Sequence, residues 1–85
     1  MSNEDIIAAI QAAIELDDIK VLTDDGSHFQ IIAVSDIYAD LSRVKKQQTI
    51  YGPLSAFIAD NRIHALSVKT YTNAQWQRER KLQGF

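Results

Sequence analysis

The chain of 85 residues contains no cysteine. This absence excludes disulfide bonds, thiolate metal ligands and cysteine nucleophiles within the chain. Only three glycines and one proline occur, and they form neither a G-x-S-x-G motif nor a glycine-rich phosphate-binding loop. No apolar run approaches the ~18 residues that a membrane span requires. We therefore expect a domain without a membrane span that is not an enzyme.

The composition is that of one small globular domain. Hydrophobic residues make up 46% of the chain, and we expect a single domain over residues 1–85 with one modest core. Near the N-terminus, Glu4 and Asp5 precede the first apolar stretch, which does not match a secretory signal peptide. The expected location is the cytoplasm, where an absence of disulfides is usual.

Charge is distributed unevenly along the chain, although the net charge is only −2. Residues 1–40 contain nine acidic side chains and one basic side chain, whereas residues 41–85 contain eight basic and two acidic ones. Such polarity favours a partner that meets one pole: an acidic protein surface, a phosphate backbone, or a second copy of the chain in a weak homodimer. Ordinary solvated helix faces explain the pattern equally well.

Apolar periodicity and end signals predict six elements. Ile6, Ile10 and Ile14 recur at helical spacing behind a possible Ser2 cap. The alternating run 19–23, the DDGSH turn and the β-branched run 29–35 predict a hairpin. The expected elements are a helix over 3–16, strands over 19–23 and 29–35, a helix from about 42 to 60, a strand over 64–70, and a short helix after Thr72.

The second predicted helix has mixed signals. Ser42 is a suitable N-cap, and Val44, Ile50, Leu54 and other apolar residues share a broad face. Pro53, which follows Gly52, lacks a backbone N–H, so we expect it to kink or split this helix. Thr72 and Gln75 form a capping-box pattern at the start of the last helix.

The order of elements predicts an α+β fold, α-β-β-α-β-α, with a three-stranded mixed sheet. A strand, a helix and a further strand form a crossover, so strands two and three should be parallel neighbours. We expect the strand order 1-2-3 with the helices packed on one face of the sheet. Trp76 should pack back on the sheet and anchor the last helix.

The two histidines are the candidate metal ligands. His28 and His64 are 36 residues apart in sequence, which matches no local ligand spacing. If their strands are parallel neighbours about 4.8 Å apart, however, both imidazoles lie at one edge of the sheet. Two histidines do not complete a tetrahedral site, and Asp24 and Asp25 of the turn are the nearest carboxylates. A site completed by another molecule and simple packing of the histidines both remain open.

Catalysis and nucleic-acid binding are the other functions to weigh. Ser27, His28 and a nearby aspartate suggest a triad, but adjacent side chains on a strand point to opposite faces. A basic surface for nucleic acid would use Arg43, Lys45 and Lys46, near a helix N-terminus. It could extend to Arg62, Lys69, Arg78, Arg80 and Lys81. The G-x-x-G clamp of KH domains is absent, and the isoelectric point of about 5.5 argues against tight binding.

Four segments resemble the BolA family, in particular its small bacterial members. They are GSHFQIIAVS, LSRVKKQQTIYGPL, NRIHALSVKTYT and WQRERKLQGF, and the resemblance covers about residues 18–85 in the family's order. The run IHALSVKTYT before a tryptophan is the most specific of these motifs. Asn73 stands where the family often has proline, a change at the first turn of a helix.

The resemblance implies a KH-like arrangement of the α-β-β-α-β-α elements and a role in iron–sulfur cluster handling. Members of the family pair with monothiol glutaredoxins, and a [2Fe–2S] cluster is bridged between them, with glutathione supplying one thiolate. The family's C-terminal ligand histidine corresponds to His64, and its second ligand, a cysteine or histidine before strand two, corresponds to His28. No cluster is expected to bind tightly to the isolated chain. Some members are DNA-binding regulators, which implicates the basic helix.

Overall fold

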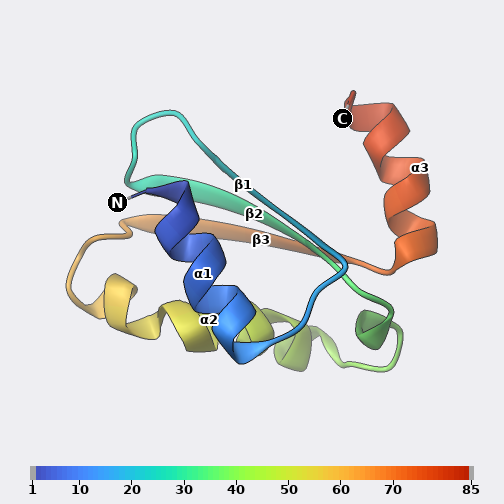
Figure 1. Ribbon diagram of the computed structural model, residues 1–85, viewed down its shortest axis with the longest axis horizontal. Coiled ribbons are helices and arrows are strands. Elements are labelled where there is room, and N and C mark those ends of the chain that lie inside the picture. The colour runs from blue at the N-terminus through green and yellow to red at the C-terminus, as the bar shows by residue number, and fades with distance from the viewer. Residues whose placement is uncertain (1, 85) are drawn as a thin grey trace.

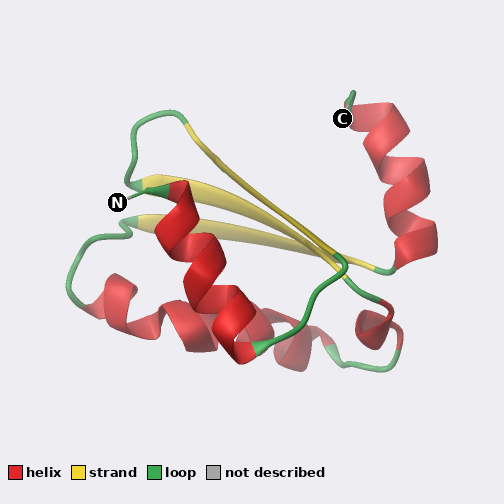
Figure 2. Ribbon diagram, viewed as in Figure 1, coloured by secondary structure: helices red, strands yellow, loops and turns green. Residues whose placement is uncertain are grey.

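The computed structural model describes residues 2–84 and contains six main elements, in the order expected from the sequence (Figure 1). They are α1 (Asn3–Ala13), β1 (Asp18–Thr23), β2 (His28–Val34), α2 (Arg43–Ala59), β3 (Ala65–Tyr71) and α3 (Asn73–Gln83), with a short 3-10 helix, η1 (Asp36–Ala39), after β2. Figure 2 shows the three strands side by side, with helices on both sides of them. The predicted α+β class and its α-β-β-α-β-α order are confirmed.

The sheet has the predicted strand order, β1-β2-β3. β1 and β2 are antiparallel, with Val21 opposite Ile31, because a tight turn joins them. β2 and β3 are parallel, with His28 opposite Ala65, because α2 carries the chain back across the sheet. Both sequence-based pairings are therefore correct.

The inner face of the sheet forms the main core with α1 and α2. Phe29, Ile31 and Ala33 of the central strand point to this face, since alternate residues of a strand share a face. They pack among apolar side chains of α1 and α2, namely Ile6, Ile10, Ile50 and Leu54, each fully buried.

The helix α3 lies on the opposite face of the sheet. Trp76, which is 3% exposed, packs there with Ile32 and Val34, and its ring centroid is 5.5 Å from that of Tyr71. The expected anchoring role of Trp76 is confirmed, but the expectation that all helices share one face is wrong. The reason is that β2 is apolar on both faces over Ile31–Val34, so each face needs its own cover.

The helix ends are mostly as expected. The side chains of Ser2, Ser42 and Thr72 each accept a hydrogen bond from a backbone N–H of the first turn, and Thr72 and Gln75 form the full capping box. However, α1 ends at Ala13 rather than at residue 16, since Ile14 has extended dihedral angles.

The helix α2 departs from expectation in two ways. Of the kink or split expected at Pro53, the split does not occur, because the helix continues from Arg43 through Pro53 to Ala59. Buried Ile50 and Leu54 hold the turns on both sides of the proline against one core, which offsets the lost backbone hydrogen bond. Val44 does not join the apolar face and is 63% exposed. None of the helices within residues 2–84 is long and apolar enough to cross a membrane.

Candidate functional site

His28 is held by the turn that joins β1 to β2. Asp25 Oδ1 accepts the backbone N–H groups of Ser27 and His28, at 2.9 and 2.8 Å. Gly26 has φ +76°, a left-handed conformation suited to glycine, and its N–H donates to Thr23 Oγ1 at 2.9 Å. The Thr23 hydroxyl in turn donates to the His28 carbonyl at 2.7 Å. These bonds close the turn and fix the backbone of His28 as the first residue of β2.

His64 is held by the loop that enters β3. Asn61 adopts a left-handed conformation (φ 67°) after α2, and the next turn is closed by the Ile63 N–H, which donates to the Phe57 carbonyl at 3.2 Å. Ile63 is buried and anchors the loop in the core. The backbone N–H of His64 then donates to the carbonyl of Ser27 at 2.8 Å, which ties this loop to the β1–β2 turn.

The two imidazole rings lie next to each other at the start of the parallel strands. Their centroids are 6.1 Å apart and their planes are nearly perpendicular, at 84°. Both side chains are exposed. The parallel pairing of β2 with β3 brings together two residues that are far apart in sequence, as the sequence-based argument expected.

The His28 ring has a carboxylate partner. Its Nδ1 lies 2.6 Å from Asp25 Oδ2. The backbone N–H groups of His28 and Ser27 hold the pKa of Asp25 well below its usual range, since these bonds favour the charged form. Because an ionised carboxylate only accepts hydrogen bonds, His28 Nδ1 is the donor in this contact, and in a neutral imidazole Nε2 is then the nitrogen with the free lone pair.

Ser27 also reaches the His28 ring, with its Oγ 3.2 Å from Nδ1. The expectation that these adjacent side chains point to opposite faces is therefore wrong, because Ser27 belongs to the turn and not to the strand. The arrangement still differs from a catalytic triad. In a triad the serine and the aspartate contact different ring nitrogens, whereas here both lie at Nδ1.

The two imidazoles are candidate ligands for a metal centre. Within residues 2–84, no group of three or more histidine and carboxylate side chains is arranged to hold a metal ion. The His28–His64 pair could occupy two positions of a four-coordinate iron, and ligands from a second molecule would have to fill the others.

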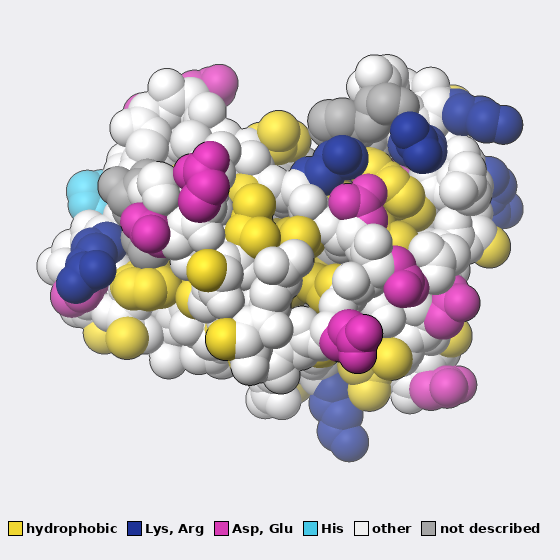
Figure 3. Space-filling model, viewed as in Figure 1, with side chains coloured by type: hydrophobic (Ala, Val, Ile, Leu, Met, Phe, Trp, Pro, Cys, Tyr) yellow, Lys and Arg dark blue, Asp and Glu magenta, His cyan; other side chains and the backbone are white. Residues whose placement is uncertain are grey.

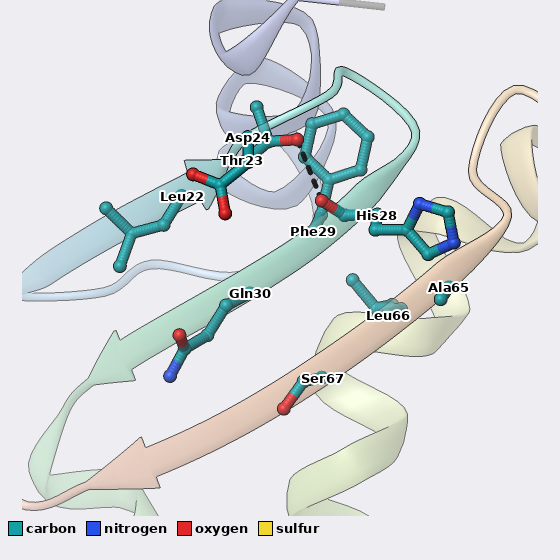
Figure 4. A pocket seen from close by; sticks show the side chains of 9 residues that line it. All are labelled: Leu22, Thr23, Asp24, His28, Phe29, Gln30, Ala65, Leu66 and Ser67. Carbon is teal, nitrogen blue, oxygen red and sulfur yellow. Dashed lines mark hydrogen bonds between the residues drawn. The ribbon is translucent and has the colours of Figure 1, made fainter.

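An open groove of about 620 Å³ adjoins His28 on the outer face of the sheet. Figure 4 shows the side chains of Leu22, Gln30 and Ser67 lying across the three strands, while the His28 ring points toward the start of β3. α3 covers only the other end of this face, where Trp76 packs. The imidazole pair thus lies beside a surface that a second molecule can approach.

The candidate nucleic-acid residues are divided between two layers. Arg43, Lys45 and Lys46 lie in the first turn of α2, on the inner side of the sheet. Lys69 is paired with Ile32 and so points to the outer face, where α3 carries Arg78, Arg80 and Lys81. Figure 3 shows basic side chains gathered over α3 and others at the left and lower edges, with acidic side chains between them. These residues therefore do not form one continuous basic surface on this face.

Sequence reasoning identified both histidines but missed the role of Asp25 as the hydrogen-bond partner of one of them. A signal was present: an aspartate three residues before a histidine, with glycine between them, has the spacing of an Asx-type turn. The bond between the Ser27 carbonyl and His64 had no sequence signal, since it joins two loops.

Comparisons with known proteins agree on one family. The family described as BolA-like protein matches residues 9–75. The chain is 55% identical to the acid stress protein IbaG of Escherichia coli K12 over 85 residues, which is the full length of both. It is also 39% identical to the DNA-binding transcriptional regulator BolA of Vibrio cholerae over 51 residues, 60% of this chain and 47% of that protein. The solution structure of mouse BolA1 has the same fold, with a TM-score of 0.75 at 21% identity, over 89% of this chain and 68% of that one.

Proposed function

The chain belongs to the BolA-like family, and we propose that it is a cytoplasmic, non-enzymatic adaptor in iron–sulfur cluster handling. In this proposal it pairs with a monothiol glutaredoxin, and the two proteins share a bridged [2Fe–2S] cluster. The observation that carries the proposal is the placement of His28 and His64, whose ring centroids are 6.1 Å apart at an exposed edge of the sheet. The similarity of the chain to an acid stress protein supports a role for this adaptor in the stress response.

The chemistry of the pair suits a shared cluster. The chain has no cysteine, so the thiolates must come from the partner and from glutathione. Neutral imidazole ligands in place of thiolates make a cluster less negative and raise its reduction potential. A cluster held partly by His28 and His64 would therefore differ in potential from one held by glutaredoxins alone, which suits either transfer or sensing.

Reconstitution of the mixed complex tests the ligand assignment. Visible absorption and circular dichroism of the cluster-loaded complex with a monothiol glutaredoxin should change when His64 is replaced by alanine, and again when His28 is. Ser67→Ala, which alters the same groove without removing an imidazole, is the matched control and should leave the spectra unchanged. Unchanged spectra and cluster stability in His64→Ala would contradict the proposal.

Nucleic-acid binding is the second candidate, favoured by the partial similarity to the V. cholerae regulator. It would use Arg43, Lys45 and Lys46 at the start of α2, where the helix N-terminus also favours phosphate. It predicts an affinity for DNA that falls steeply with salt and drops in the double variant Lys45→Ala/Lys46→Ala. The variant Arg80→Ala/Lys81→Ala on α3 shows whether the outer face takes part. Undetectable or salt-insensitive binding would exclude this function.

A further inference from the structure

Asp25 uses its two carboxylate oxygens for different purposes. Oδ1 accepts the backbone N–H groups of Ser27 and His28, which shapes the turn. Oδ2 lies 2.6 Å from His28 Nδ1 and makes no contact that the turn needs. Thr23 closes the same turn independently through its bonds to Gly26 and to the His28 carbonyl. The contact made by Oδ2 therefore acts on the imidazole ring and not on the backbone.

Stability does not explain this contact. The two side chains are 61% and 51% exposed, and ion pairs at such positions contribute little to folding. The short distance instead indicates a directional, charge-assisted hydrogen bond that restricts the ring. The ring plane is further defined by its nearly perpendicular neighbour, His64.

We propose that Asp25 is a positioning residue for His28: it fixes the Nδ1–H tautomer and the ring orientation, so that Nε2 is the ligand atom. The inference rests on the proposed function, because it assumes that His28 is a cluster ligand. It identifies which nitrogen coordinates and which group selects that nitrogen. Metal-binding histidines commonly donate their other N–H to a carboxylate, which fixes the tautomer and makes the ligand nitrogen more basic.

The variant Asp25→Asn isolates this effect. The asparagine oxygen can still accept from the backbone N–H groups of Ser27 and His28, so the turn is retained. Its amide NH₂ replaces Oδ2 and can only donate, which favours an unprotonated Nδ1 and a proton on Nε2. Asp24→Asn is the matched control, since it removes one negative charge from the same turn while leaving the Asp25–His28 contact intact.

The first measurement uses the isolated protein and needs no cluster. Two-dimensional ¹⁵N spectra of the imidazoles, recorded where His28 is neutral, should show the Nδ1–H tautomer in the wild type and in Asp24→Asn. In Asp25→Asn the population should shift to Nε2–H, while backbone amide spectra confirm that the fold is retained. A wild-type His28 with a predominant Nε2–H tautomer would overturn the inference, as would identical tautomer populations in all three proteins.

The second measurement uses the cluster-loaded complex with a monothiol glutaredoxin. Asp25→Asn should lower cluster affinity by about 10–100-fold and alter the visible circular dichroism, whereas Asp24→Asn should not. If His28→Ala weakens the cluster but Asp25→Asn does not, the positioning role is wrong and the proposed function stands. If neither His28→Ala nor Asp25→Asn weakens cluster binding while the tautomer still shifts, His28 is not a cluster ligand. The proposed function then fails at His28, and so does the positioning role of Asp25.

Discussion

The backbone N–H of His64 donates to the carbonyl of Ser27 at 2.8 Å, and this bond joins the two loops that carry the imidazoles. The neighbouring N–H of Ala65 points to the same carbonyl, at 3.3 Å. The loops before β2 and β3 are thus connected at their backbones next to the two rings. Loops connected in this way would lose little backbone freedom if the two rings bound a common partner.

Because of this connection, we expect His28 and His64 to act as one site. In the glutaredoxin complex, the double variant His28→Ala/His64→Ala should lose little more cluster affinity than the more damaging single variant. Residues that share one site are coupled in a double-mutant cycle. Cluster retention, followed by visible circular dichroism during chelator challenge, measures this coupling. Additive losses would show that the histidines bind separate groups.

Acid should affect the turn through Asp25. The pKa of its carboxyl group is lowered in the folded protein by the backbone N–H groups of His28 and Ser27. The stability that it contributes is therefore present above the unfolded-state pKa of about 3.9 and is lost as pH falls below it. Urea unfolding between pH 2 and 6 should show a flatter acid limb for Asp25→Asn than for the wild type. A slope equal to that of the wild type would contradict the assignment.

Trp76 should carry most of the attachment of α3. It is the buried residue of that helix and packs on Ile32 and Val34. Trp76→Ala should lower the free energy of unfolding by about 3–5 kcal/mol, and Trp76→Phe by clearly less. Denaturant unfolding monitored by far-ultraviolet circular dichroism provides the measurement. A loss below 1 kcal/mol would mean that the capping box alone holds the helix.

Tyr51 links α2 to β3. Its hydroxyl donates to the Leu66 carbonyl at 2.9 Å. Tyr51→Phe removes only this bond and should cost about 0.5–1.5 kcal/mol of stability. Tyr71→Phe is the matched control, since it removes a tyrosine hydroxyl on the other face of the sheet, where the ring packs on Trp76. Equal effects of the two substitutions in denaturant unfolding would show that the Tyr51 bond contributes nothing of its own.

Much of the fold follows from local signals that act over a few residues. The N-caps Ser42 and Thr72 each accept a hydrogen bond from a backbone N–H of the first helical turn. These bonds depend only on neighbouring residues and not on tertiary contacts. The crossover through α2 makes β2 and β3 parallel neighbours, which brings His28 and His64 to one edge of the sheet. The site was predictable to that extent because it depends on topology.

Other features depend on contacts between distant segments. Gly52 and Pro53 predicted a kink or a split in α2, but burial of Ile50 and Leu54 against one core keeps the helix from splitting. Asn73, in a position where proline is frequent, donates its N–H to Asp36 at 3.0 Å and its side-chain amide to Asp17 at 2.8 Å. These bonds tie the start of α3 to segments 37 and 56 residues away in sequence.

The sequence by itself determined the order of elements, the strand pairing and the absence of thiolate ligands from the chain. The first two follow from apolar periodicity and chain connection, and the third follows directly from the composition. Only the tertiary structure decided that α3 covers the outer face, since the apolar run of β2 offers both faces equally. The tertiary structure also decided that the Asp25 carboxylate forms a hydrogen bond with the His28 ring and that the Ser27 carbonyl accepts one from the His64 backbone N–H. Hydrogen bonds of this kind depend on distances of a few tenths of an ångström, which residue spacing does not encode.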